Sequence, residues 1–183
     1  MPEKNFGMVQ VFWGSGRGKT SAALGTALRA LGRGFNVHLV QFLKGGIEGT
    51  ESFDDYGELI ALNKFPNFSF ERFGFREWVI GNPKPEHMEQ AQRALASAKF
   101  AVKMGKYDLV VIDECLYAVQ LGILPEQEIV ELMKSKAKNT ELILTGSHRP
   151  LEKIFEAADL VTEMRKIKHP FDRGIGARKG IEY

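Results

Sequence analysis

A short glycine-rich stretch, WGSGRGKTS, contains the residues of this sequence best suited to phosphate chemistry. Its glycines alternate with other residues and lead directly into Lys19 and Thr20. Backbone amides of such a loop can surround phosphate oxygens, the lysine can neutralise their charge, and the threonine hydroxyl can bind Mg²⁺. The usual phosphate loop, however, begins with a glycine at the position that Trp13 occupies here. The candidate phosphate-binding residues are Gly14, Ser15, Gly16, Arg17, Gly18, Lys19, Thr20 and Ser21.

The flanking segments favour phosphate binding over an accidental glycine-rich turn. Residues 7–13 are apolar and β-branched, as in a buried strand, and Leu24, Leu28 and Leu31 then recur at helical spacing. A loop between a strand and the amino end of a helix is a ready anion site. The dinucleotide fingerprint Gly-x-Gly-x-x-Gly is the nearest alternative, and it fails because Lys19 stands at the third glycine position.

Two carboxylates, Asp113 and Glu114, follow the apolar run LVVI. Acids at a strand end are weak evidence when taken alone, because many are simply solvated. Combined with Lys19 and Thr20, they predict a metal–nucleotide site, because the acids would face the phosphate loop across one sheet edge.

Strand-like and helix-like segments alternate along the chain, which predicts an α/β fold with three layers. We expect a mainly parallel six-stranded sheet with helices on both faces, of the RecA-like P-loop nucleotide-binding type. The fifth strand, ending at Thr145 and Gly146, is expected to insert between the first and the fourth. The expected strands are 7–13, 36–43, 68–75, 107–114, 140–146 and 159–164. The expected helices follow the glycine loop and occupy about 85–105, 125–137 and 150–158.

Residues 44–67 show little periodicity, and we expect a long mobile loop with one short helix around 52–62. Further along, the aromatic residues Phe73, Phe75 and Trp78 are interleaved with arginines. This aromatic group could form a flat ligand surface or a partner contact, or it could be an aromatic edge of the core. The residues alone leave both interpretations open.

Composition sets further limits. The 183 residues are 44% hydrophobic and 26% charged, which fits one globular domain spanning 1–183. A net charge of +2 gives no reason to expect nucleic acid as a partner, and the basic tail reads as a solvated face. The sequence has one cysteine, no apolar run long enough to span a membrane, and no signal-peptide pattern near its start. We therefore expect a cytoplasmic protein.

Several stretches together resemble one family, the P-loop ATP:corrinoid adenosyltransferases. The matching segments are GSGRGKTSAALGTALRALGRG, VQFLKG, VVIDE, LILTG, ADLVTEM and KHPFDRGIGARKGIEY. The last segment is the most specific, because the family's tail runs His-x-Phe-Asp-x-Gly and ends Gly-Ile-Asp/Glu-Tyr. The family's glycine loop also lacks the first standard glycine, so Trp13 is no departure from it.

The resemblance implies transfer of the 5′-deoxyadenosyl group of ATP to the Co(I) centre of a reduced corrinoid, with triphosphate as the leaving group. The product would be adenosylcobalamin or a precursor of it, and the substrate cobalamin, cobinamide or an earlier corrinoid. Lys19 and the loop amides would bind phosphates, and Thr20 and Glu114 would hold Mg²⁺ with Asp113 in support. No general base is needed, because Co(I) carries no proton.

By the same resemblance, Gln41 and Lys44 would line the site. Phe75 and Trp78 match the aromatics that the family packs beneath the corrin ring, where they displace the lower axial base and ease reduction of Co(II). The tryptophan stands one residue later here than in the family motif. Several relatives have an N-terminal extension that covers the partner subunit's site, and the stretch before Gly14 is shorter, so another segment would have to supply a lid or the site would be more open.

The resemblance further implies a homodimer and allows a flavoprotein electron donor. Two other functions use the same nucleotide site. A small P-loop hydrolase would release phosphate by activating water with Glu114, and a non-catalytic sensor would use ATP to order residues 44–67. The family tail distinguishes the transferase, since neither alternative has a reason for it.

Overall fold

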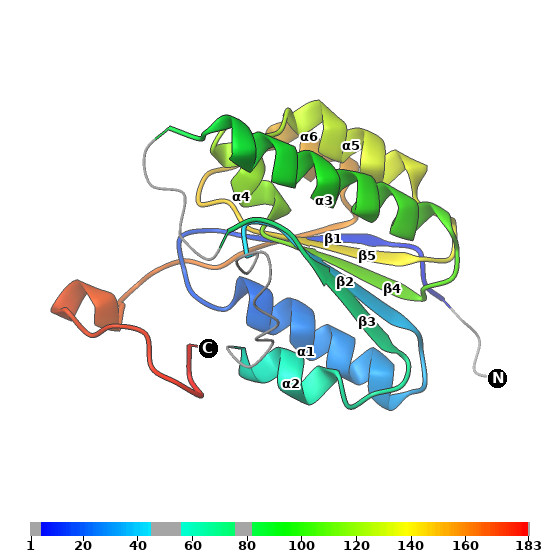
Figure 1. Ribbon diagram of the computed structural model, residues 1–183, viewed down its shortest axis with the longest axis horizontal. Helices are drawn as coiled ribbons and strands as arrows, with labels where there is room; N and C mark the ends of the chain where they lie inside the picture. Colours follow the sequence, from blue (N-terminus) through cyan, green and yellow to red (C-terminus); the bar gives the residue numbers. More distant parts are fainter. Residues whose placement is uncertain (1–4, 45–55, 76–81, 183) are drawn as a thin grey trace.

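The computed structural model describes residues 5–44, 56–75 and 82–182. Six strands form one sheet in the order β3-β2-β4-β5-β1-β6, and every pairing is parallel (Figure 1). The strands are β1 Val9–Trp13, β2 Val37–Gln41, β3 Phe68–Arg72, β4 Leu109–Asp113, β5 Glu141–Thr145 and β6 Leu160–Glu163. The predicted sheet is confirmed, and β5 lies between β1 and β4 as expected, with Leu142 opposite both Val9 and Val110.

Helices cover both faces of this sheet, which confirms the three-layer prediction. Figure 1 shows α1 and α2 on one face and α3, α4, α5 and α6 on the other. The helices are α1 Lys19–Gly32, α2 Gly57–Leu62, α3 Pro85–Lys103, α4 Cys115–Gln120, α5 Glu126–Ser135 and α6 Glu152–Ala157, followed by a 3₁₀ turn, Pro170–Arg173. None of the helices in the described residues is both long and apolar enough to cross a membrane.

Each sheet face has its own apolar core because side chains alternate along a strand. Val40 and Ile112 point to the layer of α3 to α6, whereas Leu39 and Val111 point to α1 and α2. Central strands β2, β4 and β5 are buried along their whole length. Burial of this kind fixes the register, since a slip of one residue would exchange the two faces.

The structure differs from the sequence prediction at three places. Strand β3 ends at Arg72 instead of 75, since the chain turns at Gly74, where a side chain would collide with the backbone of Leu43. Helix α4 was not predicted; it begins directly after β4 and has only six residues. The short helix expected at 52–62 is α2, Gly57–Leu62. Of the mobile loop expected at 44–67, residues 45–55 lie outside the described residues.

Parallel strands bring their carboxyl ends to one edge, and this edge collects the candidate functional residues. Strand β1 leads into the glycine loop, and β4 ends at Asp113. On either side of β4, β2 ends at Gln41 and β5 ends at Thr145. The sheet order therefore sets the end of β4 beside two polar side chains, Gln41 and Thr145, and close to the loop.

Candidate nucleotide site

The glycine loop is shaped by its contacts with the chain that follows β5 and β6. The Gly16 N–H donates to the Met164 carbonyl at 2.6 Å, and the Gly14 N–H donates to the Ser147 carbonyl at 3.0 Å. Gly14 has a φ of 113°, and a Cβ there would collide with the backbone of Met164. A Cβ on Gly16 would lie 2.7 Å from the Met164 carbonyl oxygen. Glycine is required at both positions because the backbone of Met164 leaves no room for a side chain.

Trp13 stands at the position of the first standard glycine, and its side chain packs in the core. Its half-buried ring lies 5.0 Å from the ring of Phe155 in α6 and joins the core on that face. The tight turn begins one residue later, and it ends at Gly18, whose φ of 114° is left-handed. Helix α1 starts immediately afterwards at Lys19, so its amino end faces the loop.

Lys19 lies over the loop that precedes it. Its Nζ donates to the carbonyl oxygens of Gly14 at 2.7 Å and Gly16 at 2.9 Å. Burial lowers the pKa of Lys19, and the carboxylates of Glu114 and Asp113 partly offset that effect. The ammonium is thus held at the centre of the loop, where phosphate oxygens bound by the loop amides would meet it.

Asp113 is fully buried and serves as an acceptor for four side chains. Its Oδ1 accepts from the Thr20 hydroxyl at 2.8 Å and from the Thr145 hydroxyl at 2.6 Å. Its Oδ2 accepts from Lys44 Nζ at 2.7 Å and Gln41 Nε2 at 3.1 Å. Burial would raise the pKa of Asp113, but the Lys44 ammonium and these hydrogen bonds keep it below its ordinary value. Asp113 is therefore an ionised anchor behind the site.

Of the two adjacent acids at the end of β4, Glu114 is the one that faces the cavity. It follows β4 in the left-handed region, with a φ of 62°, and begins α4. Burial, together with repulsion from Asp113, raises the pKa of Glu114 to about 6. At neutral pH a largely ionised, poorly solvated carboxylate faces the cavity, which favours a bound cation.

Lys44 and Gln41 support this pair of acids from the end of β2. Burial alone would lower the pKa of Lys44, but the charges of Asp113 and Glu114 outweigh it, and the pKa is raised. Lys44 therefore keeps its charge. Gln41 is buried and donates to Asp113, and its Oε1 has no hydrogen-bond partner within the part of the chain that the structure describes.

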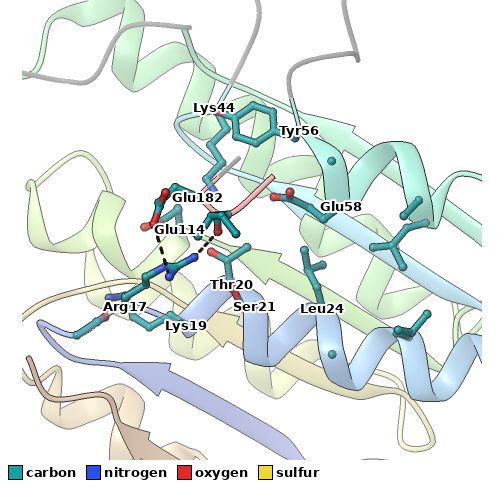
Figure 2. Close-up of a pocket in the computed structure, with 18 of the residues that line it drawn as sticks. Arg17, Lys19, Thr20, Ser21, Leu24, Lys44, Tyr56, Glu58, Glu114 and Glu182 are labelled. Carbon is teal, nitrogen blue, oxygen red and sulfur yellow. Dashed lines mark hydrogen bonds and ion pairs between the residues drawn. The ribbon is translucent and has the colours of Figure 1, made fainter. Parts of the chain in front are cut away.

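A cavity of about 770 Å³ opens in front of these groups (Figure 2). One side is polar and consists of the glycine loop, Lys19, Thr20 and Glu114. The other side, between α1 and α2, is apolar. It is lined by Leu24, Leu28, Ala61, Leu62 and Phe65. A ligand with both a polyanionic and an apolar part matches this division.

The predicted site residues fall into three groups. Nine of them line the cavity directly: Ser15, Gly16, Arg17, Gly18, Lys19, Thr20, Ser21, Lys44 and Glu114. Behind them lie Gly14, Gln41 and Asp113. Phe75 is not part of the cavity wall formed by the described residues; its ring packs edge-on against His87, 5.4 Å away. Trp78 lies outside the described residues.

The C-terminal stretch forms a further wall that sequence reasoning did not assign to the cavity. Figure 1 shows the segment after β6 leaving the sheet and turning back towards α1. Arg17 of the glycine loop donates to the Ile181 carbonyl and lies 3.6 Å from the Glu182 carboxylate (Figure 2). Hydrogen bonds from Arg178 lower the pKa of Glu182 to about 2. The basic residues of the tail are exposed, as expected, but Gly180 to Glu182 face the cavity.

Other cavity residues were also missed. Tyr117 and His148 lie a few residues beyond β4 and β5, and their rings are 5.4 Å apart. The strand-end position was their only sequence signal. Tyr56 and Glu58 come from the start of α2, in a segment in which no individual residue was predicted to line the site.

Arg17→Ala is expected to loosen the C-terminal stretch. An exposed ion pair and hydrogen bond of this kind are weak, so tryptic cleavage after Arg178 should become only about two- to five-fold faster. Lys166→Ala is a matched control, because it breaks an exposed 2.9 Å ion pair earlier in the same tail. Unchanged cleavage in Arg17→Ala would show that Arg17 does not hold the stretch.

A parallel sheet with a glycine loop between β1 and α1 and acids after β4 defines a P-loop nucleotide-binding protein of RecA-like architecture. The sequence matches the family described as ATP:corrinoid adenosyltransferase BtuR/CobO/CobP over residues 5–183, and the chain belongs to that family. The resemblance seen in the sequence is thereby confirmed.

Individual relatives agree with the family assignment. The chain is 36% identical over 186 residues to a corrinoid adenosyltransferase of Escherichia coli (strain K12), covering 97% of this chain and 86% of that protein. It is 35% identical, with the same coverage, to the corrinoid adenosyltransferase CobA of Salmonella typhimurium. A corrinoid adenosyltransferase of Pseudomonas aeruginosa is 34% identical over 184 residues, or 97% of this chain and 84% of that one.

Proposed function

We propose that the chain transfers the 5′-deoxyadenosyl group of ATP to the Co(I) centre of a reduced corrinoid and releases triphosphate. Membership of the family makes ATP-dependent adenosylation of a corrinoid its activity. One observation carries the proposal further: the glycine loop, Glu114 and the C-terminal stretch share a single cavity. A phosphate-releasing enzyme needs the glycine loop and Glu114, but it has no use for the C-terminal stretch.

The glycine loop would bind the triphosphate of ATP. Loop amides and the amino end of α1 supply hydrogen-bond donors and partial positive charge. Lys19, held over the loop by the carbonyls of Gly14 and Gly16, would neutralise the charge that develops on the leaving triphosphate. These groups exist before the ligand binds, so little reorganisation is required during the reaction.

The bond changes explain why the cavity needs no general base. An electron pair of Co(I) attacks C5′ of the ribose and forms the Co–C bond. The C5′–O bond breaks, and its electrons leave with the triphosphate. No proton is transferred from the nucleophile, so the protein's contribution is to align C5′ with cobalt and to stabilise the leaving group.

The chemistry of the donor set fits Mg²⁺. Thr20 offers a hydroxyl oxygen, and Glu114 offers a carboxylate whose raised pKa reflects burial beside Asp113. Hard oxygen donors of this kind, together with phosphates, are the usual ligands of Mg²⁺. Thr20 and Glu114 would hold the ion, and Asp113 would position the Thr20 hydroxyl. When bound, the ion would supply charge neutralisation at the phosphates.

The corrinoid would meet the open side of the cavity. The apolar wall between α1 and α2, which includes Leu28 and Phe65, supports binding of a large apolar surface there. From the family resemblance we also propose that Phe75 and Trp78 act beneath the corrin ring. In that role they would displace the lower axial base and ease reduction of Co(II) to Co(I).

Phe75→Ala should therefore slow reactions that start from Co(II) by about five-fold or more, in keeping with the loss of about 1 kcal/mol of aromatic contact. Reactions started from chemically pre-reduced Co(I) should change less. Phe65→Ala, on the apolar cavity wall, is the control, and it should affect both starting states to the same degree. Equal losses from Co(II) and Co(I) in Phe75→Ala would remove the axial-base role.

We also propose a homodimer, a flavoprotein electron donor and a cytoplasmic location. The edge strand β6 supports the first of these, because Leu160 and Val161 point to opposite faces of the sheet and are both exposed. Parallel sheets normally have both faces covered, so a second subunit is a natural cover. Light scattering of the purified protein measures the subunit number directly.

The released product tests the proposed function against its rivals. ATP and reduced cobalamin incubated with the protein should yield one triphosphate per adenosylated corrinoid. Inorganic phosphate without alkylation would identify a hydrolase that uses Glu114 to activate water. Binding of ATP with neither product would identify a nucleotide sensor.

A further inference from the structure

We infer that Thr145, at the end of β5, is a positioning residue that orients Glu114 and thereby sets the affinity of the cavity for the Mg²⁺ complex of ATP. The inference rests on the proposed function in one respect, namely that Thr20 and Glu114 hold the metal. Thr145 is fully buried and does not line the cavity formed by the described residues. Any effect it has on a ligand must therefore act through other residues.

A single hydroxyl joins the two acids of the site. Thr145 Oγ1 donates to Asp113 Oδ1 at 2.6 Å and accepts from the Glu114 N–H at 3.0 Å. Since the only proton of the hydroxyl is committed to the ionised Asp113, a lone pair is left for the Glu114 N–H. The bond fixes the peptide between Asp113 and Glu114, from which the cavity carboxylate projects.

Glu114 needs such support because its backbone is unfavourable for a residue with a side chain. Its φ of 62° lies in the left-handed region, and such a conformation persists only where the surroundings determine it. The Glu114 carbonyl accepts from the N–H groups of Tyr117 and Ala118 at 3.1 and 3.2 Å, which holds one side of the residue. Thr145 holds the other side through the Glu114 N–H.

Gly146 shows how closely the end of β5 is fitted against this turn. A Cβ on Gly146 would lie 2.7 Å from the Tyr117 nitrogen and 3.3 Å from the Glu114 Cα. The backbone after β5 is therefore in direct contact with the turn that presents Glu114. Thr145 and Gly146 together form the support, and Thr145 alone supplies its hydrogen bonds.

Thr145 is also linked to the second proposed metal ligand. Asp113 Oδ1 accepts from both Thr145 and Thr20, so the position of this oxygen depends on both hydroxyls. Loss of the Thr145 hydroxyl would free Asp113 Oδ1 to shift and would leave the Glu114 N–H without its acceptor. Both proposed metal ligands, Thr20 and Glu114, would then lose orientation, whereas the phosphate-binding loop amides would not.

The test compares Thr145→Val with Thr145→Ser. Valine keeps the branched shape and removes both hydrogen bonds, and serine restores the hydroxyl without the methyl group. ATP binding is measured by calorimetry with excess Mg²⁺ and again with EDTA. In Thr145→Val we expect the Kd with Mg²⁺ to rise about 10- to 100-fold, as for other residues that orient metal ligands. The Kd in EDTA should change less than about two-fold, and Thr145→Ser should stay close to wild type.

Two results with Thr145→Val would overturn the inference. The variant could bind ATP as tightly as wild type in the presence of Mg²⁺, or it could lose the same affinity with and without Mg²⁺. If Thr145→Val does not fold, as judged by its melting curve, Thr145→Ala takes its place. If wild-type ATP binding is insensitive to Mg²⁺, the proposed metal role fails and this inference fails with it. If the wild-type protein adenosylates the corrinoid and Thr145→Val keeps the full effect of Mg²⁺ on ATP binding, the inference about Thr145 is overturned while the proposed function stands.

Discussion

Lys19→Ala is expected to reduce adenosyl transfer by about 10²- to 10³-fold, the usual cost of removing one group that stabilises developing negative charge. Lys19 carries the only ammonium that the described structure holds against the glycine loop carbonyls, at 2.7 and 2.9 Å. Without it, the leaving triphosphate loses its nearest neutralising charge. The loss should appear in kcat, because the charge develops as the C5′–O bond breaks.

The fold should survive this substitution. Burial already disfavours the charged form of Lys19, as its lowered pKa indicates, and its partners are carbonyls of the loop itself. The melting temperature should therefore stay within a few degrees of wild type. Lys168→Ala removes an exposed tail lysine of equal charge and serves as the control. Turnover near the wild-type rate in Lys19→Ala would remove the phosphate-loop assignment.

Glu114→Gln should lower activity and raise stability at once. Transfer should fall by about 10²-fold, because an amide is a poorer ligand for Mg²⁺ than a carboxylate and carries no charge to attract it. The ligand-free protein should nevertheless become more stable above pH 6. The reason is that Glu114 is held ionised in a buried place beside Asp113.

The direction of the pH effect follows from the raised pKa. A shift of the Glu114 pKa from 4.5 to about 6 means that the folded state binds the proton more tightly than the unfolded state. This tighter proton binding stabilises the folded state in full below pH 4.5, and the stabilisation is lost as pH rises through about 6. The free energy of unfolding falls by about 2 kcal/mol over this range. Glutamine does not titrate, so its advantage over wild type should grow across this window and level off above it.

Urea denaturation near pH 5 and pH 7.5 measures this difference. Glu58→Gln, which removes another carboxylate from the cavity wall, is the matched control. A Glu114→Gln protein that is less stable than wild type at both pH values would contradict the assigned electrostatics. Saturating MgATP should reverse the order, since it stabilises wild type more than the variant.

The sequence predicted the sheet and the glycine loop well because both depend on local patterns. Apolar runs such as LVVI are typical of strands that are covered on both faces of a parallel sheet, and alternating glycines before Lys19 are typical of a phosphate-binding loop. Helix α4 escaped prediction since the left-handed turn at Glu114 starts it directly after β4, without a recognisable loop.

The different roles of Asp113 and Glu114 could not be predicted from their adjacent positions in the sequence. Which acid is enclosed and which faces the cavity depends on Lys44, shortly after β2, and Thr145, at the end of β5, both of which are far away in the sequence. The contact of Arg17 with the C-terminal stretch is likewise a long-range pairing. A basic tail has no periodicity that would indicate a cavity wall, and only the family motif pointed to its importance.

The most direct test of the central claim is an anaerobic reaction of chemically reduced cob(I)alamin with MgATP and the purified protein. Absorbance follows the Co(I) spectrum, and the product is then exposed to light. The proposed function predicts loss of the Co(I) spectrum, a light-sensitive alkylcobalamin and one triphosphate per turnover. Persistence of the Co(I) spectrum while phosphate accumulates would contradict it and would identify the cavity as that of a hydrolase.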